Sequence, residues 1–468
     1  MNLPRPARRS WWLEEALAAE PGPPCPPLDR DTETDVVILG GGYTGMWTAH
    51  FLKERHPGTD VVLLERDICG GGPSGRNGGF CNGFWEELDV LVHALGPGGA
   101  LETCRVAERS IGEIGRWCER HGVDAWYSRN GHMGVATSPA QDGLWHALVE
   151  EATRLRVEWL EELSTEEVRA RCDSPVFRAG VFAPRAATLQ PARLARGLRR
   201  VIAEQGVRIY ERTAVRRFRQ GPPAEAATER GRVRAAYGVL ATGAWSSRMR
   251  RFHRAIVPRG SYILVTEPAP ERLQEIGWTG GEGIYDHRSA LHYLRTTPDG
   301  RIAFGAAGST TGVGGGLGPR MDYDRLSIER LVRSFRRMFP SFREVPLAAA
   351  WGGPMDITGL HLPFFGTLPS GNVHYGMGYT GGGVGPCHMA GRILSGMVLG
   401  IEDGYARLPL VSLEPKRFPP EPLLAIGAAI VQEAIVRRDE AQDRGRRPNP
   451  VVDLVARLPR RLGYELGP

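Results

Sequence analysis

Two short runs of apolar residues near the N-terminus form the clearest pattern in the chain. Residues 36–39 (VVIL) follow Asp35, and residues 61–64 (VVLL) come after a segment of helical length. Continuous apolar runs of this kind are typical of parallel strands that are covered on both faces. They predict the start of an α/β domain, in which a helix joins two strands of one sheet.

Helical periodicity dominates between about residues 101 and 205. Ser164, with Glu167 three residues later, forms a capping box, and Pro191 opens a helix that Gly206 ends. We therefore expect this region to be largely helical. The apolar repeats that carry the prediction are Ile111, Ile114 and Cys118; Leu144, Leu148 and Leu155; and Leu194, Leu198 and Ile202.

A strand-rich block follows this region. Residues 257–266, 290–296 and 301–305 have the composition of strands, and the turn at 298–300 (PDG) joins the last two in a hairpin. No internal repeat of fixed period is present. A helical repeat closes the block, carried by Ile328, Leu331, Phe335 and Met338.

The strongest chemical signal is a glycine-rich turn directly after the first predicted strand. Gly40 permits a tight turn, Gly42 admits a pyrophosphate, and Gly45 lets the following helix pack on the strand. The free N–H groups at the start of that helix then face the phosphates. Glu65 ends the second strand, where a carboxylate accepts hydrogen bonds from a ribose. The turn predicts a dinucleotide site that also includes Tyr43, Thr44 and Arg66.

Three further glycine-rich segments follow, and the loops at 70–79 and 376–385 favour FAD over NAD. The loop at 70–79 suggests a ligand that extends beyond the contacts of a single dinucleotide-binding turn. Residues 238–245 read as a buried strand that ends in small residues, where backbone approaches a ligand closely. At 376–385 a glycine run precedes a helix through Ala390 to Met397, whose N-terminus would stabilise negative charge on a reduced flavin. The expected contacts are Ser74, Arg76, Asn77, Gly78 and Gly79; Ala241, Thr242 and Gly243; and Gly378, Tyr379, Thr380, Gly381, Gly382, Gly383 and Val384.

These four segments, in this order, resemble the D-amino-acid oxidase/glycine oxidase (DAO) family of FAD-dependent oxidoreductases. The GGGYTG run at residue 40 and the SGRNGG run at residue 74 carry most of the likeness, which spans roughly residues 30–400. It implies a Rossmann-type α/β FAD-binding domain, with Val215 against the adenine, interleaved with a substrate domain on a large antiparallel sheet, so that the whole chain is α+β. The expected parts are an N-terminal arm at 1–30, FAD-binding segments at 31–105, 186–256 and 352–402, substrate-domain segments at 106–185 and 257–351, and a C-terminal extension at 403–468.

The resemblance also implies a reaction, the oxidation of the C–N bond of a small amine or amino acid to an imine by hydride transfer to flavin N5. In the first strand of the predicted hairpin, Tyr293 and Arg295 share one face. Arg295 suits bidentate binding of a substrate carboxylate, and a structural salt bridge is the alternative. Tyr262, Trp351 and Tyr379 are candidate aromatic walls around an amine, with core packing as the alternative.

Departures from the family bear on the electron acceptor. Some relatives use an active-site lysine for reaction with oxygen, but the only lysines here are Lys53, in the first helix, and Lys416, in the extension. Many relatives carry a histidine where this chain has Gly382. Oxygen is the expected acceptor. The alternatives are a dehydrogenase or biosynthetic tailoring enzyme with another acceptor, or a flavin-bound subunit of a larger complex.

Cys387 is expected to pack within a helix, so we expect non-covalent FAD.

Composition argues against several other classes. The chain has 59 Lys and Arg against 53 Asp and Glu, but the cations are nearly all arginine and are interleaved with acids, so no nucleic-acid partner is expected. The 7 cysteines form no C-x-x-C pair, and no H-E-x-x-H occurs, which predicts neither a disulfide framework nor a metal site. No run approaches the ~20 apolar residues of a membrane span. With no signal peptide recognised, we expect a cytoplasmic protein of open oligomeric state.

The two ends of the chain carry weaker signals. The first 33 residues are rich in Pro and Arg and predict an arm on the surface, with Trp11, Trp12 and Leu13 as its anchor. Residues 423–436 are apolar and follow Pro422, which predicts a docking helix in the extension.

Overall fold

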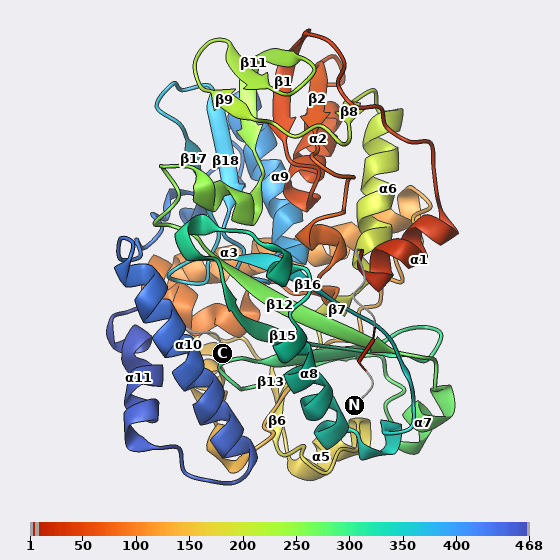
Figure 1. The fold of residues 1–468 in the computed structure, drawn as a ribbon, viewed down its shortest axis with the longest axis vertical. Coiled ribbons are helices and arrows are strands. Elements are labelled where there is room, and N and C mark those ends of the chain that lie inside the picture. The colour runs from red at the N-terminus through yellow and green to blue at the C-terminus, as the bar shows by residue number, and fades with distance from the viewer. Residues whose placement is uncertain (1–2, 5–8, 466–468) are drawn as a thin grey trace.

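The computed structural model describes residues 3–4 and 9–465, which form two eight-stranded sheets and one two-stranded sheet (Figure 1). The predicted apolar runs lie at the centre of the first sheet, where β1 (Thr32–Leu39) pairs in parallel with both β2 (Val61–Leu64) and β11 (Arg232–Leu240). The sheet is completed by parallel β8 (Arg208–Tyr210) and β18 (Val373–Met377), and by antiparallel β17 (Phe364–Thr367), β9 (Arg217–Arg219) and β10 (Ala224–Ala227).

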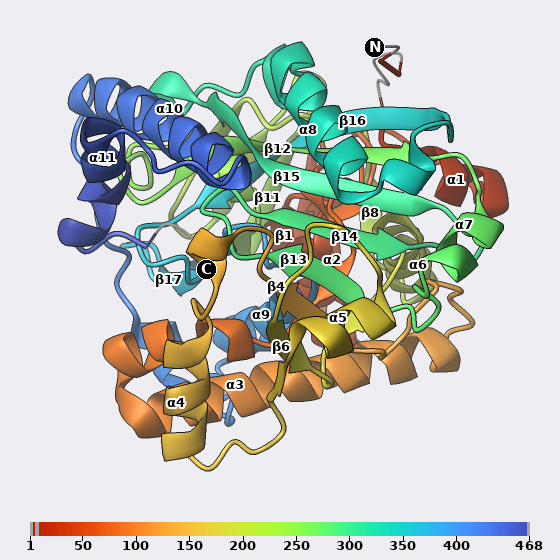
Figure 2. The same ribbon diagram turned by 90° about the horizontal axis from the view of Figure 1, so that it is seen from below.

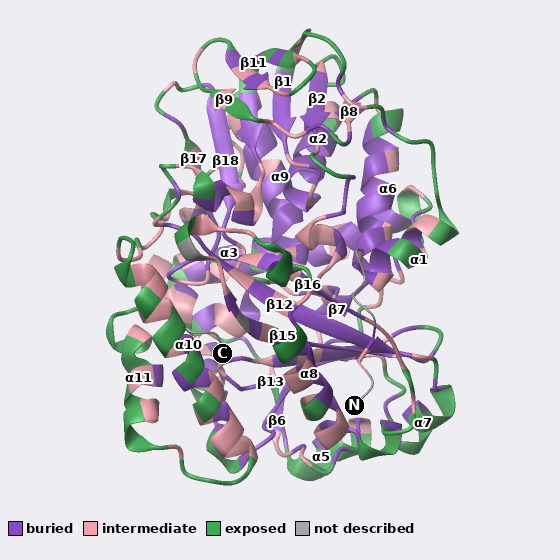
Figure 3. Ribbon diagram, viewed as in Figure 1, coloured by how far each residue is buried: buried purple, intermediate pink, exposed green. Residues whose placement is uncertain are grey.

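Both faces of the first sheet are covered, which explains why its central strands are apolar at successive positions. One face packs against β10 and residues 252–256. Figure 3 shows the central strands largely buried. A Cβ at Gly391 would lie 2.5 Å from the Cβ of Trp47, so glycine allows two of the covering helices to approach closely. The other face packs against α2 (Tyr43–Arg55), α3 (Leu88–Arg120), α6 (Pro191–Glu204) and α9 (Val384–Leu399).

The second sheet confirms the predicted strand-rich block. Its order is β16-β12-β15-β14-β13-β4-β6-β5, in which β4 is His132–Val135, β6 is Gly180–Ala183 and β5 is Glu161–Leu163. The predicted hairpin turns at Gly300, where φ is +83°. Neighbouring strands are antiparallel except β13 and β4, which run parallel, so the expected antiparallel sheet is mixed at one pair. The elements are β12 (Val257–Thr266), β13 (Gly283–Asp286), β14 (His292–Thr296), β15 (Ile302–Thr311) and β16 (Leu347–Ile357), with α7 (Pro270–Glu275) and α8 (Arg325–Met338) beside them.

The prediction that residues 101–205 are largely helical is only partly right. The helix from Pro191 is present as α6, α4 (His146–Arg154) and α5 (Thr165–Arg171) are formed, and the Ser164 capping box is confirmed. The same region also contributes short strands to two sheets. Strands this short leave little room for an alternating pattern, so their pairing with distant strands decides their structure. They are β4 (His132–Val135), β5 (Glu161–Leu163), β6 (Gly180–Ala183) and β7 (Ala187–Thr188), the last paired with β3 (Phe80–Cys81).

The N-terminal segment is anchored in the core where the sequence placed its anchor, whereas residues 18–24 are exposed. It forms α1 (Trp11–Ala19), which Ser10 caps by accepting a hydrogen bond from the Leu13 N–H. Trp12 and Leu13 are both 0% exposed. The Trp12 ring lies 6.1 Å from that of Trp351, so this segment is part of the core between the two sheets.

The C-terminal extension forms a helical pair, α10 (Leu423–Asp443) and α11 (Pro450–Arg461), which lie side by side in Figures 1 and 2. The docking helix predicted after Pro422 is therefore present and is longer than expected. It docks on the second sheet, where Gln432 Nε2 donates to the Gly308 carbonyl (3.2 Å) and Asp439 accepts from the Ala290 N–H (3.1 Å). Across the described residues, none of the helices combines the length and apolar character that crossing a membrane requires.

Candidate active site

A cavity of about 2170 Å³ lies between the two sheets. Its lining runs from the turn after β1 and the loop at 70–78 to strands β12, β13 and β14 of the second sheet. Pockets for one small molecule are typically about 300–1,000 Å³. The cavity therefore has room for a dinucleotide together with a substrate.

The glycine turn after β1 has the geometry that a phosphate cradle needs. Gly40 has φ of +112°, and a Cβ there would lie 2.4 Å from the Ala241 carbonyl oxygen. Gly42 is the N-cap of α2 and has no side chain to cap the helix, so the helix N-terminus faces the cavity, with the Tyr43 N–H bonded to Ser74 Oγ (2.9 Å). Gly45 does not line the cavity. A Cβ there would lie 2.0 Å from the Gly40 carbonyl oxygen, which gives it the packing role expected from the sequence.

Glu65 lies at the cavity wall beside this turn, at the end of β2. Its carboxylate accepts hydrogen bonds from the N–H groups of Gly41 (2.8 Å) and Asp67 (2.8 Å). Burial raises its pKa, and those two bonds act in the opposite direction. A carboxylate has about four acceptor positions, so two are left for ribose hydroxyl groups. Arg66 and Val215 line the same end of the cavity.

The loop at 70–79 is held by its own polar side chains. Asn77 Oδ1 accepts from the Gly79 N–H (2.7 Å), and Ser74 Oγ accepts from the Tyr43 N–H (2.9 Å). Arg76 Nη1 donates to the Gly352 carbonyl (2.9 Å), so this arginine ties the loop to β16. Ser74, Arg76, Asn77 and Gly78 line the cavity. Gly79 lies behind it, where its φ of +76° and the nearby Leu189 carbonyl leave no room for a side chain.

The glycine segment before α9 forms the opposite wall of the cavity. Residues 379–384 line it, together with Ala241, Thr242 and Gly243. Gly378 is set back and donates its N–H to buried Asp356 (2.6 Å), whose pKa burial raises to about 6. Because α9 begins at Val384, its N-terminus faces the cavity.

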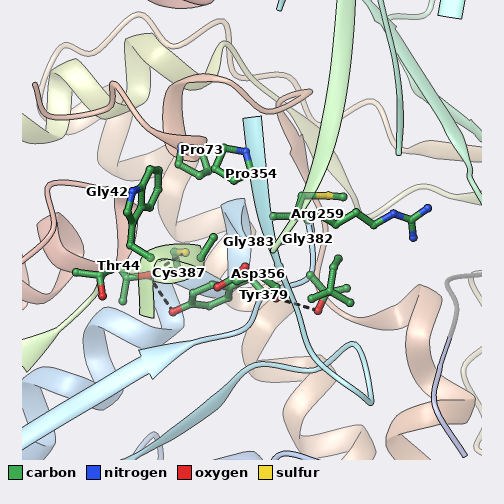
Figure 4. Close-up of a pocket in the computed structure, with 18 of the residues that line it drawn as sticks. Gly42, Thr44, Pro73, Arg259, Pro354, Asp356, Tyr379, Gly382, Gly383 and Cys387 are labelled. Carbon is green, nitrogen blue, oxygen red and sulfur yellow. Dashed lines mark hydrogen bonds between the residues drawn. The ribbon is translucent and has the colours of Figure 1, made fainter. Parts of the chain in front are cut away.

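Cys387 is the cysteine of α9 that lines the cavity. Figure 4 shows it with Thr44 and Tyr379, where Thr44 Oγ1 lies 3.2 Å from Cys387 Sγ and 2.9 Å from the Tyr379 hydroxyl. Burial raises the pKa of the Cys387 thiol to about 12. The thiolate is the reactive form of cysteine, and burial favours the protonated thiol at this position.

The structure separates the two residues expected to share a face toward the substrate. Tyr293 lines the cavity, and its hydroxyl lies 2.8 Å from Ser261 Oγ. Arg295 does not line it. That guanidinium is buried against the Trp12 ring (5.7 Å) and donates to the Leu189 carbonyl. Its hydrogen bonds are to backbone rather than the salt bridge expected as the alternative, and burial lowers its pKa to about 10.

Tyr262 and Trp351 are core residues that do not line the cavity, in contrast to the expected aromatic walls. The Tyr262 hydroxyl donates to the Arg320 carbonyl (2.7 Å), and Trp351 Nε1 donates to the Arg76 carbonyl (2.9 Å). On β12 the neighbouring Ser261 lines the cavity instead. Successive side chains of a strand point to opposite faces, so this register excludes Tyr262.

Several polar residues of the lining were missed by the sequence reasoning. Glu86 Oε2 accepts from Asn82 Nδ2 (2.7 Å), and Glu86 Oε1 lies 3.4 Å from His132 Nδ1. Burial, Glu86 and Asp89 together raise the pKa of Glu87 to about 8. No periodic pattern marked these positions, because Glu86 and Glu87 come directly after a loop and His132 lies in a strand of only four residues. The other missed polar residues of the lining include Arg259, Tyr285, His287, His361 and Arg460.

One cavity is thus faced by a helix N-terminus after β1, by a carboxylate at the end of β2 and by the second sheet, which defines a dinucleotide-binding protein of the Rossmann type. Residues 35–397 match the family described as FAD dependent oxidoreductase (DAO). The chain belongs to this family and is an FAD-dependent oxidoreductase. The glycine cradle, Glu65 and the helix N-termini are the donors and acceptors that fit FAD.

Individual relatives agree with this assignment. Gamma-glutamylputrescine oxidoreductase of Escherichia coli (strain K12) is 30% identical over 424 residues, which cover 88% of this chain and 96% of that protein. Sarcosine oxidase subunit beta of Arthrobacter sp. is 24% identical over 365 residues, which cover 75% of this chain and 83% of that protein. The crystal structure of glycine oxidase from Bacillus cereus ATCC 14579 has the same fold, with a TM-score of 0.64 at 20% identity over 82% of this chain and 99% of that one.

Proposed function

We propose that the protein oxidises the C–N bond of a small amine or amino acid to an imine. The observation that carries this proposal is the set Glu86, Glu87, His132, Tyr285 and Tyr293, which we call the amine wall. All five line the cavity, and a Cβ at Gly78, in the flavin-binding loop, would lie 2.8 Å from the Tyr293 ring. Adjacent carboxyl groups among aromatic rings suit a substrate that arrives as an ammonium ion.

The chemistry that FAD supplies when bound is acceptance of a hydride from the carbon beside the nitrogen. The role of the protein's own residues is to orient that carbon and to keep the amine neutral. An alkyl ammonium ion has a pKa near 10.4, so it must lose a proton first. Glu87, with its pKa near 8, is placed to take that proton, and Glu86 adds to the negative potential. Water then hydrolyses the imine.

We propose oxygen as the electron acceptor. The second candidate is a dehydrogenase or tailoring enzyme with another acceptor, and one observation favours it: neither lysine lines the cavity. Lys53 Nζ donates to the Thr59 carbonyl (2.9 Å), and Lys416 Nζ donates to the Leu462 carbonyl (2.6 Å).

The test uses purified protein containing FAD. Anaerobic mixing with a panel of primary amines, secondary amines and amino acids should bleach the oxidised flavin band for at least one compound. If none bleaches it, the proposed reaction is wrong. Subsequent mixing with oxygen should restore the band within one turnover time, and slow recovery would select the second candidate.

We also propose a cytoplasmic location. The seven cysteines are all buried thiols without disulfides, which supports a reducing compartment. Fractionation of the native host would test it, and recovery of the protein from an oxidising compartment would contradict it.

A further inference from the structure

The helix pair α10 and α11 carries most of the large apolar side chains that the surface exposes. Among the described residues eleven such side chains are exposed, and seven of them belong to this pair, each between 44% and 67% exposed. They are Leu423, Ile426 and Ile430 on α10, and Val451, Leu454, Leu458 and Leu462 on α11 and its C-cap, which we call the apolar stripes. Single apolar residues scattered over a surface are ordinary, whereas a gathered set marks an interaction surface.

Helical spacing places the apolar stripes on one side of the pair. They recur at i, i+3 and i+7 on α10, and at i, i+3, i+7 and i+11 on α11. The two helices meet around Ile435 and Ala456. On each helix the stripe lies about 100° around the axis from these contacts, in the same sense. The short connection at 444–449 makes the pair antiparallel (Figures 1 and 2), so both stripes face the same way.

The second sheet lies on the other side of this pair. Gln432 and Asp439, which hold α10 to the sheet, lie about half a turn from the stripe on that helix. Figure 3 shows exposed residues along both helices. The apolar stripes therefore face away from the body of the protein and pack against none of its sheets.

Positive charge flanks the apolar stripes. Residues 444–462 contain six arginines and one acid, Asp453. Arg446 and Arg447, in the connection, and Arg461, at the end of α11, are exposed and form no ion pair within the described part of the chain. An apolar helix face bordered by arginines is typical of a helix that lies in the surface of a bilayer, where the cations meet anionic headgroups.

A second basic segment lies beside the end of α11. Residues 248–254 (RMRRFHR) contain four arginines, of which Arg250 and Arg251 are exposed. Arg254 Nε donates to the Phe418 carbonyl (2.8 Å), and the Phe418 ring stacks on that of Tyr464, which follows α11, with 5.3 Å between the ring centroids. The positive charge thus extends beyond the helix pair itself.

This charge argues against a second copy of the chain as the occupant of the stripes. In a two-fold dimer the same patch lies on both sides of the interface. The arginines beside the stripes of one copy would then approach those of the other, and like charges oppose such a contact. An anionic bilayer instead attracts the arginines, while the stripes enter the boundary between headgroups and acyl chains.

We propose that the α10–α11 pair is a docking surface for a membrane that contains anionic lipids. The pair lies on such a membrane and does not cross it. The family match ends at residue 397, so this surface belongs to the extension of this chain and is independent of the substrate that is oxidised. It agrees with the proposed cytoplasmic location, because the cytoplasmic leaflet carries anionic lipids.

Sedimentation with vesicles tests the surface on the FAD-loaded protein. Vesicles of phosphatidylglycerol and phosphatidylcholine in equal parts should bind it at least about 10-fold more tightly than vesicles of phosphatidylcholine alone. Binding should weaken as the salt concentration rises, because the exposed charges are screened.

A first variant tests the apolar contribution. Leu454→Ser/Leu458→Ser should weaken vesicle binding about 10- to 100-fold, because two half-exposed leucines no longer leave water. The matched control is Leu326→Ser/Ile401→Ser, which removes two exposed apolar side chains from elsewhere on the surface. The control should bind vesicles like the parent protein.

A second variant tests the charge. Arg446→Gln/Arg447→Gln/Arg461→Gln should weaken binding to the anionic vesicles about 100-fold at low salt. The control has the same loss of net charge at exposed arginines of α3 and of the turn between β10 and β11, and it should bind nearly as the parent does. It is Arg105→Gln/Arg120→Gln/Arg230→Gln.

The outcomes separate membrane docking from other uses of the surface. Absence of binding, or equal binding to both kinds of vesicle, would overturn the proposal, as would an equal loss in the control variants. A parent protein that is dimeric in sedimentation velocity, and monomeric after Leu454→Ser/Leu458→Ser, would overturn it too, because the stripes would then cover a second copy. FAD content and Tm should stay unchanged, since every replaced side chain is exposed. Should one variant fail to fold, the other decides.

Discussion

Replacement of Gly42 by valine tests whether the turn after β1 holds the FAD pyrophosphate. The backbone at Gly42 is extended (φ −83°, ψ −178°), a conformation that valine adopts readily. A Cβ at this position would meet one close atom, Ser74 Oγ at 3.0 Å, which is the end of a side chain that can rotate. The fold should therefore tolerate the substitution, while the added isopropyl group occupies the space in front of the helix N-terminus.

The size of the effect follows from the hydrogen bonds that would be lost. Two N–H groups at the start of α2 facing a phosphate contribute about 1.5–3 kcal/mol each, because the acceptor is charged. Their loss amounts to about 3–6 kcal/mol, which corresponds to roughly a 150- to 25,000-fold increase in Kd. Gly42→Ala should lie between the parent and Gly42→Val.

The assay is the ratio of flavin to protein absorbance after purification, followed by titration of the apoprotein with FAD. The control is Gly404→Val, where a Cβ would meet no atom within 4 Å. It should retain full FAD content. Full FAD loading of Gly42→Val, with its Tm unchanged, would refute the assignment of this turn to the pyrophosphate.

Three further predictions concern single side chains. Glu87→Gln should lower kcat/KM about 10- to 100-fold, within the range for general base catalysis, and should abolish a rise in kcat/KM with pH near 8; retention of that rise would exclude Glu87 as the base. The folded-state pKa of Glu87, about 8, lies above the unfolded value near 4.3. The free energy of unfolding of the parent should therefore fall as pH rises between those values, and it should fall less in Glu87→Gln. Chemical denaturation at several pH values would show this. Tyr293→Phe should lower kcat/KM with FAD content unchanged, whereas Tyr262→Phe should cost about 1–3 kcal/mol of stability and leave kcat/KM nearly unchanged; the reverse pattern would contradict the cavity described here. Trp12→Ala should destabilise the protein by about 3–5 kcal/mol in urea titration, because its side chain is buried. A change under about 1 kcal/mol would show that α1 does not pack into the core.

Much of the first sheet and its glycine turn could be predicted because their signals are local. The tight turn at Gly40 needs a residue that accepts φ of +112°, and the strand before it is covered on both faces. Both requirements are met by residues adjacent in the chain, so they leave a pattern that can be recognised. The hairpin at Gly300 and the capping box at Ser164 were predictable for the same reason.

The substrate side of the cavity could not be predicted in this way, because distant segments meet there. Glu86 faces His132 across 46 positions of sequence, and Arg460 joins Arg259 across about 200. Arg295 and Tyr262 have the chemistry of site residues, but the register of the second sheet and the helix α1 bury them elsewhere.

The sequence by itself determined the class of protein, through the glycine turn, the acid at the end of the second strand and the later glycine segments. These features act through backbone conformation and helix termini, which depend on neighbouring residues. Only the tertiary structure decided which polar side chains face the cavity, since strand pairing and helix docking select one face of each element. The structure thereby removed Arg295 from the residues that face the cavity, and brought the C-terminal extension into the cavity wall.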